Sequence, residues 1–177
     1  MEYFLVKPNP DYSDAPRFLD FHKKINMNDF YFNRSYGIPK RTLIRIHPNE
    51  HMDFTDYLFQ SVPLFTDTAM QVIWKYDSDF IHKEVILLST QDSIDKLYYL
   101  PFFQRFPSSV ILEPSSVYLI ERPDTVPLLK LPYSLPVFFV FLDVECMLFM
   151  RLDLVESLLR KGARGLSLRK TICFEEV

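Results

Sequence analysis

Glycine is scarce in this chain, with only Gly37, Gly162 and Gly165 among its 177 residues. Loops that bind nucleotide phosphates need several glycines at short fixed spacings, as in G-x-x-x-x-G-K and G-x-G-x-x-G. The strained G-x-S-x-G turn that presents a nucleophilic serine needs two glycines as well. The three glycines form none of these patterns. We therefore expect no phosphate-binding loop of these kinds, no serine nucleophile on such a turn and no bound cofactor.

Cysteine is also rare. Cys146 and Cys173 lack the C-x-x-C spacing of a zinc ribbon and are too few for a disulfide framework. We therefore expect free thiols in a reducing, cytoplasmic compartment. Residues 1–6 lack the basic start and the long apolar segment of a secretion signal, so no signal is predicted.

The longest apolar stretch, residues 135–152, is interrupted near its middle by Asp143 and Glu145. Ionised carboxylates are costly in a bilayer, so we expect no contact with a membrane here. The two acids could instead form a carboxylate pair with raised pKa values in a cleft. A turn between two buried strands is the interpretation with the smaller desolvation penalty, because both charges then stay in water.

Aromatic residues are abundant, with 17 Phe and 10 Tyr, which favours β-sheet because flat rings pack well on pleated surfaces. The length fits a single domain. We predict one α+β domain over residues 1–177, with an antiparallel or mixed sheet, a few short helices, and a C-terminal helix followed by a terminal strand. The predicted strands are 2–6, 41–46, 85–88, 96–100, 117–121, 137–142, 147–150 and 166–174.

Two helices are predicted in the first half of the chain. Residues 17–27 place Phe18, Phe21 and Ile25 on one helical stripe. Thr68 and Gln71 have the spacing of a capping box, which predicts a second helix from there to about residue 76.

A third helix is predicted to begin at Asp153, with Glu156 in its first turn. Val155, Leu158 and Leu159 are its expected buried stripe. Gly162 is well placed to end the helix in the left-handed conformation.

The segment 139–150, followed by 151–165, resembles the C-terminal ends of some immunity proteins of bacterial polymorphic toxin systems, of the contact-dependent or Rhs type. The shared elements are a strand, the helix pattern Leu-Asp-x-x-Glu-Ser-x-Leu-Arg at 152–160, a glycine stop and a terminal strand. The upstream segments 74–77 and 97–101 are also similar to such proteins. The resemblance implies a small bacterial cytosolic protein that binds and blocks a cognate toxin domain. It implies no catalytic residue.

His47 and His51, with Asp53 nearby, have a spacing that could gather metal ligands on one side of a helix. Pro48 between them argues against that helix, and Glu50 directly before His51 departs from the H-E-x-x-H order. We favour a loop of solvated polar residues and no metal site. A metal enzyme built on these histidines stays a third hypothesis.

Acidic residues are concentrated between positions 47 and 95, where nine acids stand against two bases. Such a stretch, folded onto one face, would attract a partner with a basic surface such as a nuclease, and it disfavours direct binding to nucleic acid. A solvated surface that only keeps the protein soluble explains the same charges.

The first functional hypothesis is therefore a non-enzymatic immunity protein that neutralises a toxin domain by direct contact. Interfaces are enriched in aromatic residues, so the hypothesis joins one tyrosine to the acids as candidate partner-binding residues. These candidates are Glu50, Asp53, Asp56, Tyr57, Asp77 and Asp79. The alternative is a general protein-interaction module or a homo-oligomeric scaffold.

Overall fold

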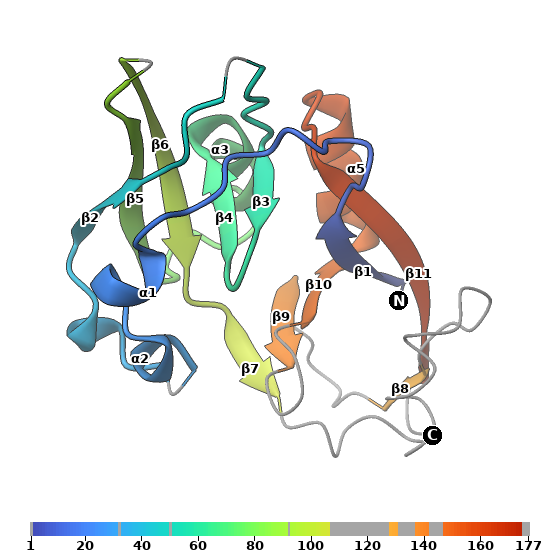
Figure 1. The fold of residues 1–177 in the computed structure, drawn as a ribbon. Helices are drawn as coiled ribbons and strands as arrows, with labels where there is room; N and C mark the ends of the chain where they lie inside the picture. Colours follow the sequence, from blue (N-terminus) through green and yellow to red (C-terminus); the bar gives the residue numbers. More distant parts are fainter. Residues whose placement is uncertain are drawn as a thin grey trace.

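The computed structural model describes residues 2–31, 33–49, 51–91, 93–106, 128–130, 137–141 and 147–174. Its strands form two sheets that lie side by side (Figure 1). Both sheets contain parallel and antiparallel pairs, and short helices pack on them, which confirms the predicted α+β class with mixed sheets.

The five-stranded sheet is built from the first half of the chain. Its strands, in spatial order, are β2 (Arg41–Arg45), β5 (His82–Ser89), β6 (Ile94–Pro101), β4 (Pro63–Thr66) and β3 (Tyr57–Phe59). The edge strand β2 runs parallel to β5, and the other neighbours are antiparallel.

The six-stranded sheet combines the first strand of the chain with the last ones. Its strands, in spatial order, are β7 (Gln104–Phe106), β9 (Phe138–Phe141), β10 (Met147–Arg151), β1 (Tyr3–Pro8), β11 (Leu166–Phe174) and β8 (Leu128–Lys130). Strand β1 pairs antiparallel with β10 on one side and with β11 on the other. The paired strands β9 and β10 fulfil the prediction of two strands within 135–152, whereas the turn with Asp143 and Glu145 lies outside the described residues.

The helices are short. Among the described residues they are α1 (Phe21–Lys24), α2 (Met27–Tyr31), the 3-10 helix η1 (Ser35–Gly37), α3 (Asp67–Ile73) and α5 (Leu152–Arg160). No helix among the described residues is long and apolar enough to span a membrane.

Two hydrophobic clusters cover opposite faces of the five-stranded sheet. Core A packs α1 and α2 on one face and includes Phe21, Ile25, Phe30, Ile44, Val85, Leu87, Tyr98 and Leu100. Core B packs α3 on the other face and joins it to β1, β10 and α5, through Tyr57, Phe65, Met70, Leu148, Met150, Leu154 and Leu158 among others. The chain passes from one sheet to the other between β6 and β7, where Phe102 belongs to core A and Phe103 to core B. The two sheets therefore share core B.

Two helix predictions need correction. The predicted helix at 17–27 is wrong in its first part, because Phe18 forms an isolated bridge with Ile46 and the helical turns are divided between α1 and α2. The helix predicted from Thr68 begins earlier. Thr66 is its N-cap, and the hydroxyl of Thr66 accepts a hydrogen bond from the backbone N–H of Ala69 at 3.5 Å.

The C-terminal helix and strand agree with the prediction except at one residue. Gly162 has a φ of +81°, the left-handed conformation expected after the helix end. The terminal strand β11 has the predicted bounds. Leu159 is 50% exposed, so its prediction as a core residue was wrong, and Leu154 takes that place.

Candidate partner-binding surface

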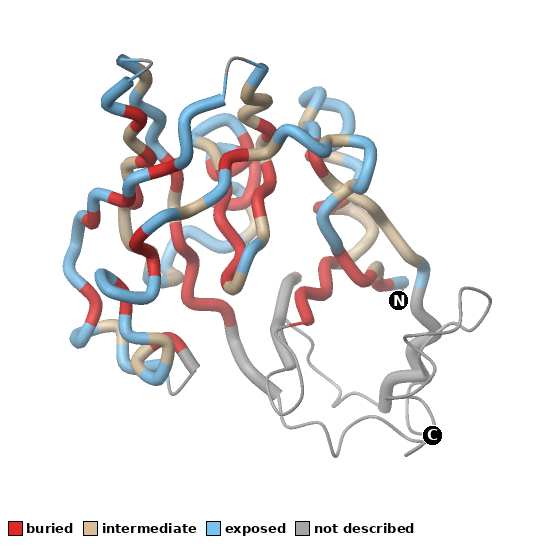
Figure 2. Tube along the Cα trace, viewed as in Figure 1, coloured by how far each residue is buried: buried red, intermediate tan, exposed pale blue. Residues whose placement is uncertain are grey.

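The five-stranded sheet has one face that its helices cover only in part. Core A fills the face that carries Thr42, Ile44 and Val85. On the opposite face α3 packs against β4 and β6. We call the remaining part of this second face the open face, formed by Arg41, Leu43, Arg45, His82, Glu84, Ile86, Leu88, Asp95, Leu97 and Tyr99. Residues along β2 alternate between exposed and buried, as the left side of Figure 2 illustrates.

An apolar row crosses the open face at right angles to the strands. Leu43 of β2 lies opposite Ile86 of β5, and Ile86 lies opposite Leu97 of β6. Leu43 is 43% exposed and Leu97 is 38% exposed. Because directly opposed residues of neighbouring strands point to the same face, these three side chains form one continuous aliphatic strip in contact with water.

A charged row lies beside the apolar one. Arg41 pairs with Glu84 through a hydrogen bond from its Nε, and this contact lowers the pKa of the Glu84 carboxyl. Tyr99 lies opposite Glu84 and donates a hydrogen bond to the Asp67 carboxylate at 3.4 Å. Burial raises the pKa of the Tyr99 phenol, and the nearby Asp67 and Glu84 raise it further. Tyr99 thus remains a hydrogen-bond donor at neutral pH.

Aromatic rings form the border between the open face and α3. The ring of His82 lies 5.3 Å from that of Trp74, 5.5 Å from that of Tyr99 and 6.1 Å from that of Phe80. The four side chains are partly buried. Ile81, between two of them in sequence, is 54% exposed. We call Trp74, Phe80, His82 and Tyr99 the aromatic cluster.

His82 has an unusual position within the cluster. Its Nδ1 atom is buried and has no hydrogen-bond partner among the described residues. Its contacts with Trp74 and Tyr99 depend on strand pairing and on the end of α3, and no local pattern indicates them.

Two of the candidate residues lie beside the aromatic cluster. Asp77 and Asp79 are exposed in the loop between α3 and β5, which connects Trp74 to Phe80. The Asp77 carboxylate accepts the backbone N–H of Asp79 at 3.1 Å, and the Asp79 carboxylate accepts the Ser78 hydroxyl at 2.9 Å. Neither carboxylate forms an ion pair within the described part of the chain, so both charges are available to a partner.

Two other candidates, Asp53 and Asp56, are engaged inside the protein. One oxygen of the Asp56 carboxylate accepts the Thr66 hydroxyl at 2.6 Å and the other accepts the Arg164 backbone N–H at 2.9 Å. Asp53 forms an ion pair with the Arg164 guanidinium at 3.0 Å. We call Asp53, Asp56, Thr66 and Arg164 the clasp, because they join the start of β3 and the start of α3 to the turn after α5.

Of the last two candidates, Tyr57 lies in the core. Tyr57 is 2% exposed, and its ring packs 5.0 Å from that of Phe65 in core B. Tyr57 therefore presents almost no surface to a partner. Glu50 lies outside the described residues.

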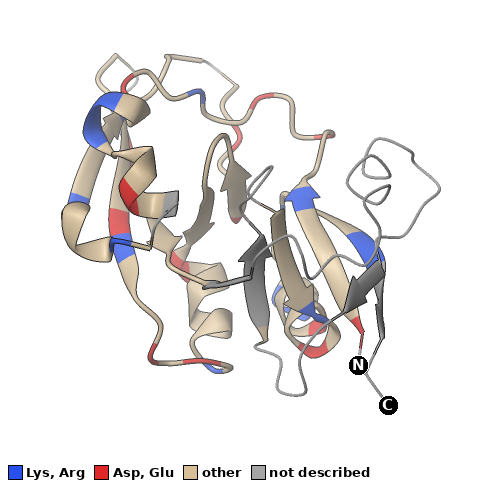
Figure 3. Ribbon diagram, turned by 90° about the horizontal axis from the view of Figure 1, so that it is seen from below, with Lys and Arg blue, Asp and Glu red and all other residues tan. Residues whose placement is uncertain are grey.

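The acidic residues of the stretch 47–95 that the structure describes are not all gathered in one place. The clasp lies at the N-terminal end of α3, where Asp56 holds Thr66, whereas Asp77 and Asp79 follow its C-terminal end. Glu84 is already paired with Arg41. Viewed from below, acidic and basic positions are scattered over the described ribbon (Figure 3).

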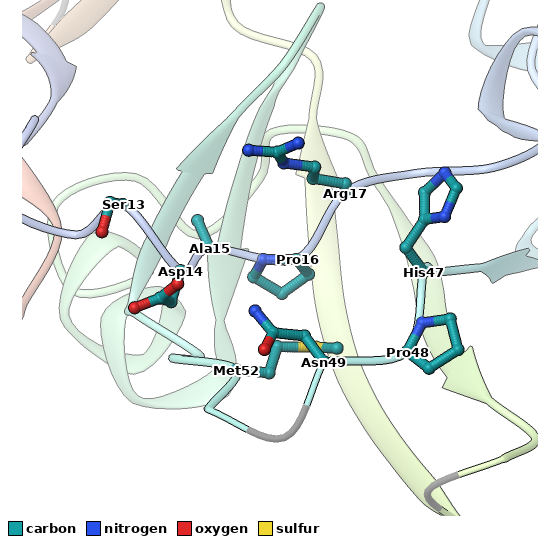
Figure 4. Close-up of a pocket in the computed structure, with 9 residues that line it drawn as sticks. All are labelled: Ser13, Asp14, Ala15, Pro16, Arg17, His47, Pro48, Asn49 and Met52. Atoms are coloured by element: carbon teal, nitrogen blue, oxygen red, sulfur yellow. The ribbon is translucent and has the colours of Figure 1, made fainter.

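The two histidines of the metal hypothesis are exposed. His47 lies at one end of a shallow pocket and Asp14 at the other, with Met52 between them (Figure 4). The other lining residues are Ser13, Ala15, Pro16, Arg17, Pro48 and Asn49. Within the described ranges, no group of three His, Cys, Asp or Glu side chains is placed to hold a metal ion.

No protein-family model matches this chain, and a search of curated proteins finds no match.

Proposed function

We propose that this protein is a non-enzymatic immunity protein, which binds a cognate bacterial toxin domain directly and neutralises it. The aromatic cluster beside Asp77 and Asp79 is the observation that supports a binding role. Partly buried Trp and Tyr side chains are the residue types that contribute most energy to protein interfaces. Here they lie next to exposed Ile81 and to two carboxylates that form no ion pair with any described residue.

The charges favour a partner with basic residues around its contact surface. Asp77 and Asp79 would speed association with such a surface, while the rings and Ile81 would provide the apolar area that is removed from water. The resemblance of residues 139–165 to immunity proteins is the reason to propose a toxin as this partner.

The direct test starts from the product of a neighbouring gene that carries a toxic C-terminal domain. Co-expression of this chain should rescue cells from that domain, and the two purified proteins should form a stoichiometric complex. If no such product binds the full chain, the proposed function is wrong.

A matched pair of variants locates the contact. Ile81→Asp places a charge beside the aromatic cluster, whereas Leu159→Asp places the same charge on α5, where the native side chain is 50% exposed. We expect Ile81→Asp to weaken binding at least tenfold, because a carboxylate would lose its hydration at the interface, and Leu159→Asp to bind as the wild type does. Equal affinities of both variants would place the contact elsewhere.

Self-association is the second candidate, and the exposed row of Leu43, Ile86 and Leu97 favours it. In that case light scattering should give a molecular mass that rises from that of one chain to that of two as the concentration increases. A constant mass of one chain would contradict it.

A further inference from the structure

Strand β2 is an edge strand, and its hydrogen bonds to β5 use every second residue. The Ile46 N–H donates to the Leu88 carbonyl at 3.0 Å, and the Lys40 carbonyl accepts from the Glu84 N–H at 2.9 Å. In a parallel pair of strands, a residue whose N–H is hydrogen-bonded to the neighbouring strand also has its C=O hydrogen-bonded to that strand. The next residue along points its N–H and C=O away from it. The N–H and C=O groups of Arg41, Leu43 and Arg45 therefore point to the outer edge.

The chain itself occupies one end of this edge. The Arg45 carbonyl accepts the Leu19 N–H at 2.8 Å, and the Arg45 N–H donates to the Asp20 carboxylate at 2.9 Å. Phe18 and Ile46 form an antiparallel bridge. The outer edge of β2 thus already accepts an extended segment at its C-terminal end.

The other end of the edge has no such cover in the described structure. The backbone groups of Arg41 and Leu43 that point outward form no hydrogen bond with any described residue. Uncovered edges pair readily with other chains, and proteins usually protect them with charges, prolines or bulges. At the middle of this edge stands Leu43, an aliphatic residue 43% exposed.

We propose that the edge at Arg41–Leu43 binds an extended segment of the partner, which adds a strand to the five-stranded sheet in line with Arg17–Leu19. The inference rests on the proposed function only in taking this partner to be the toxin domain. Main-chain hydrogen bonds would give affinity, and side chains on alternate positions would give specificity.

The charges around the edge define the chemistry of the bound segment. Arg41 is neutralised by Glu84 and Arg45 by Asp20, so neither requires a charge from the partner. On the open face the added strand would meet Leu43, with Ile86 and Leu97 beyond it. The segment is therefore uncharged, with apolar side chains at the alternate positions that face this row.

Leu43→Pro tests the hydrogen bonds of the edge. Proline removes the outward N–H of residue 43 and leaves the ladder with β5, which uses Thr42 and Ile44, so an unchanged melting temperature is expected. Binding should weaken at least tenfold, because the partner carbonyl loses its donor and the proline ring obstructs its approach.

A second pair of variants keeps the test valid if Leu43→Pro fails to fold. Leu43→Asp and Leu97→Asp introduce the same charge on the same face at similarly exposed positions, but Leu97 is two strands from the edge. Strand addition predicts a much larger loss of affinity for Leu43→Asp. Equal losses would mean docking on the sheet face and would overturn the proposal.

Random peptides displayed on phage test the edge without the toxin. Selection on the full chain should enrich peptides with alternating apolar residues that bind the Leu43→Pro variant at least tenfold more weakly. Failure to enrich peptides, or peptides that bind the variant equally well, would overturn strand addition. Enriched peptides combined with failure to bind any toxin would instead contradict the proposed function alone.

Discussion

The two acidic groups at the ends of α3 differ in what their carboxylates do. Asp53 and Asp56, at the N-terminal end, bind Thr66 and Arg164 and so connect segments distant in sequence. Asp77 and Asp79, at the C-terminal end, form hydrogen bonds only within their own loop among the described residues. Each group consists of two aspartates close together in the sequence. Of the two groups, only the second therefore has charges left for a partner.

The largest effect is expected at the turn that the clasp holds. A Cβ on Gly165, whose φ is +90°, would lie 2.6 Å from the Thr55 side chain and 2.8 Å from the Tyr57 carbonyl oxygen. Gly162 has a similar φ of +81° but open space around it. Gly165→Ala should lower the free energy of unfolding by about 3 kcal/mol and Gly162→Ala by about 1 kcal/mol, because only the first adds a clash to the backbone strain. Urea unfolding of both variants measures the difference, and equal losses would contradict a tight turn.

Asp56→Ala is expected to have the next largest effect. It leaves the Thr66 hydroxyl and the Arg164 N–H without their acceptor, which should cost roughly 2 kcal/mol of stability. Asp77→Ala, the control at the other end of α3, should stay within about 0.5 kcal/mol of the wild type because the residue is exposed. Thermal unfolding of the two variants measures this difference. Similar melting temperatures would contradict the distinction between the two acidic groups.

Asp20 is a buried carboxylate that lies outside the acidic stretch. Burial works against its charge, yet the hydrogen bonds from the side chain and backbone of Arg45 hold the pKa of Asp20 below its ordinary value. A carboxyl with a lowered folded pKa stabilises the protein above its unfolded pKa of about 4 and loses this contribution as the pH falls through the folded value.

Asp20→Asn should therefore cost about 1 kcal/mol at pH 7, and the deficit should shrink as the pH falls below about 4. Unfolding in urea at pH 7, 5 and 3 measures this. A deficit that stays constant with pH would mean that the ion pair with Arg45 contributes nothing.

The smallest effect on stability is expected when Asp77 and Asp79 are both changed to Asn. The fold should stay within about 0.5 kcal/mol of the wild type, since both side chains are exposed. Association with a basic toxin domain should slow by roughly threefold at low salt, and the difference should vanish at high salt. Surface plasmon resonance at two salt concentrations checks both parts. An unchanged association rate would mean that these acids lie outside the interface.

Elements with regular periodicity were predictable from the sequence. The alternation over residues 41–46 gave β2, and the terminal strand was placed at Leu166–Phe174. Where helix predictions failed, tertiary contacts determined the helix ends and the buried residues. Asp56, ten residues before the cap, accepts a hydrogen bond from the hydroxyl of Thr66, and Thr66 rather than Thr68 caps the helix. Leu159 is about 90° around the helix from the stripe of Leu154, Val155 and Leu158, and so faces water.

The candidate surface was only partly predictable. Asp77 and Asp79 were chosen from charge, and they lie beside the aromatic cluster. Tyr57 was chosen because tyrosines are frequent at interfaces, but its strand pairs with β4 and turns the ring towards Phe65. The apolar row exists only through the register of β2, β5 and β6. A single sequence does not encode such pairings in any local pattern.

The position of β1 has a consequence for how the protein is made. This strand is synthesised well before both of its neighbours, β10 and β11, which come from residues 147–174. During translation β1 can therefore form its strand pairs only after most of the chain has been synthesised. The apolar side chains of Tyr3, Leu5 and Val6 become buried only then. Contacts so distant in sequence slow folding and expose unpaired strands to aggregation. Fusion of a folded partner before residue 1 should therefore raise the soluble yield more than the same partner fused after residue 177.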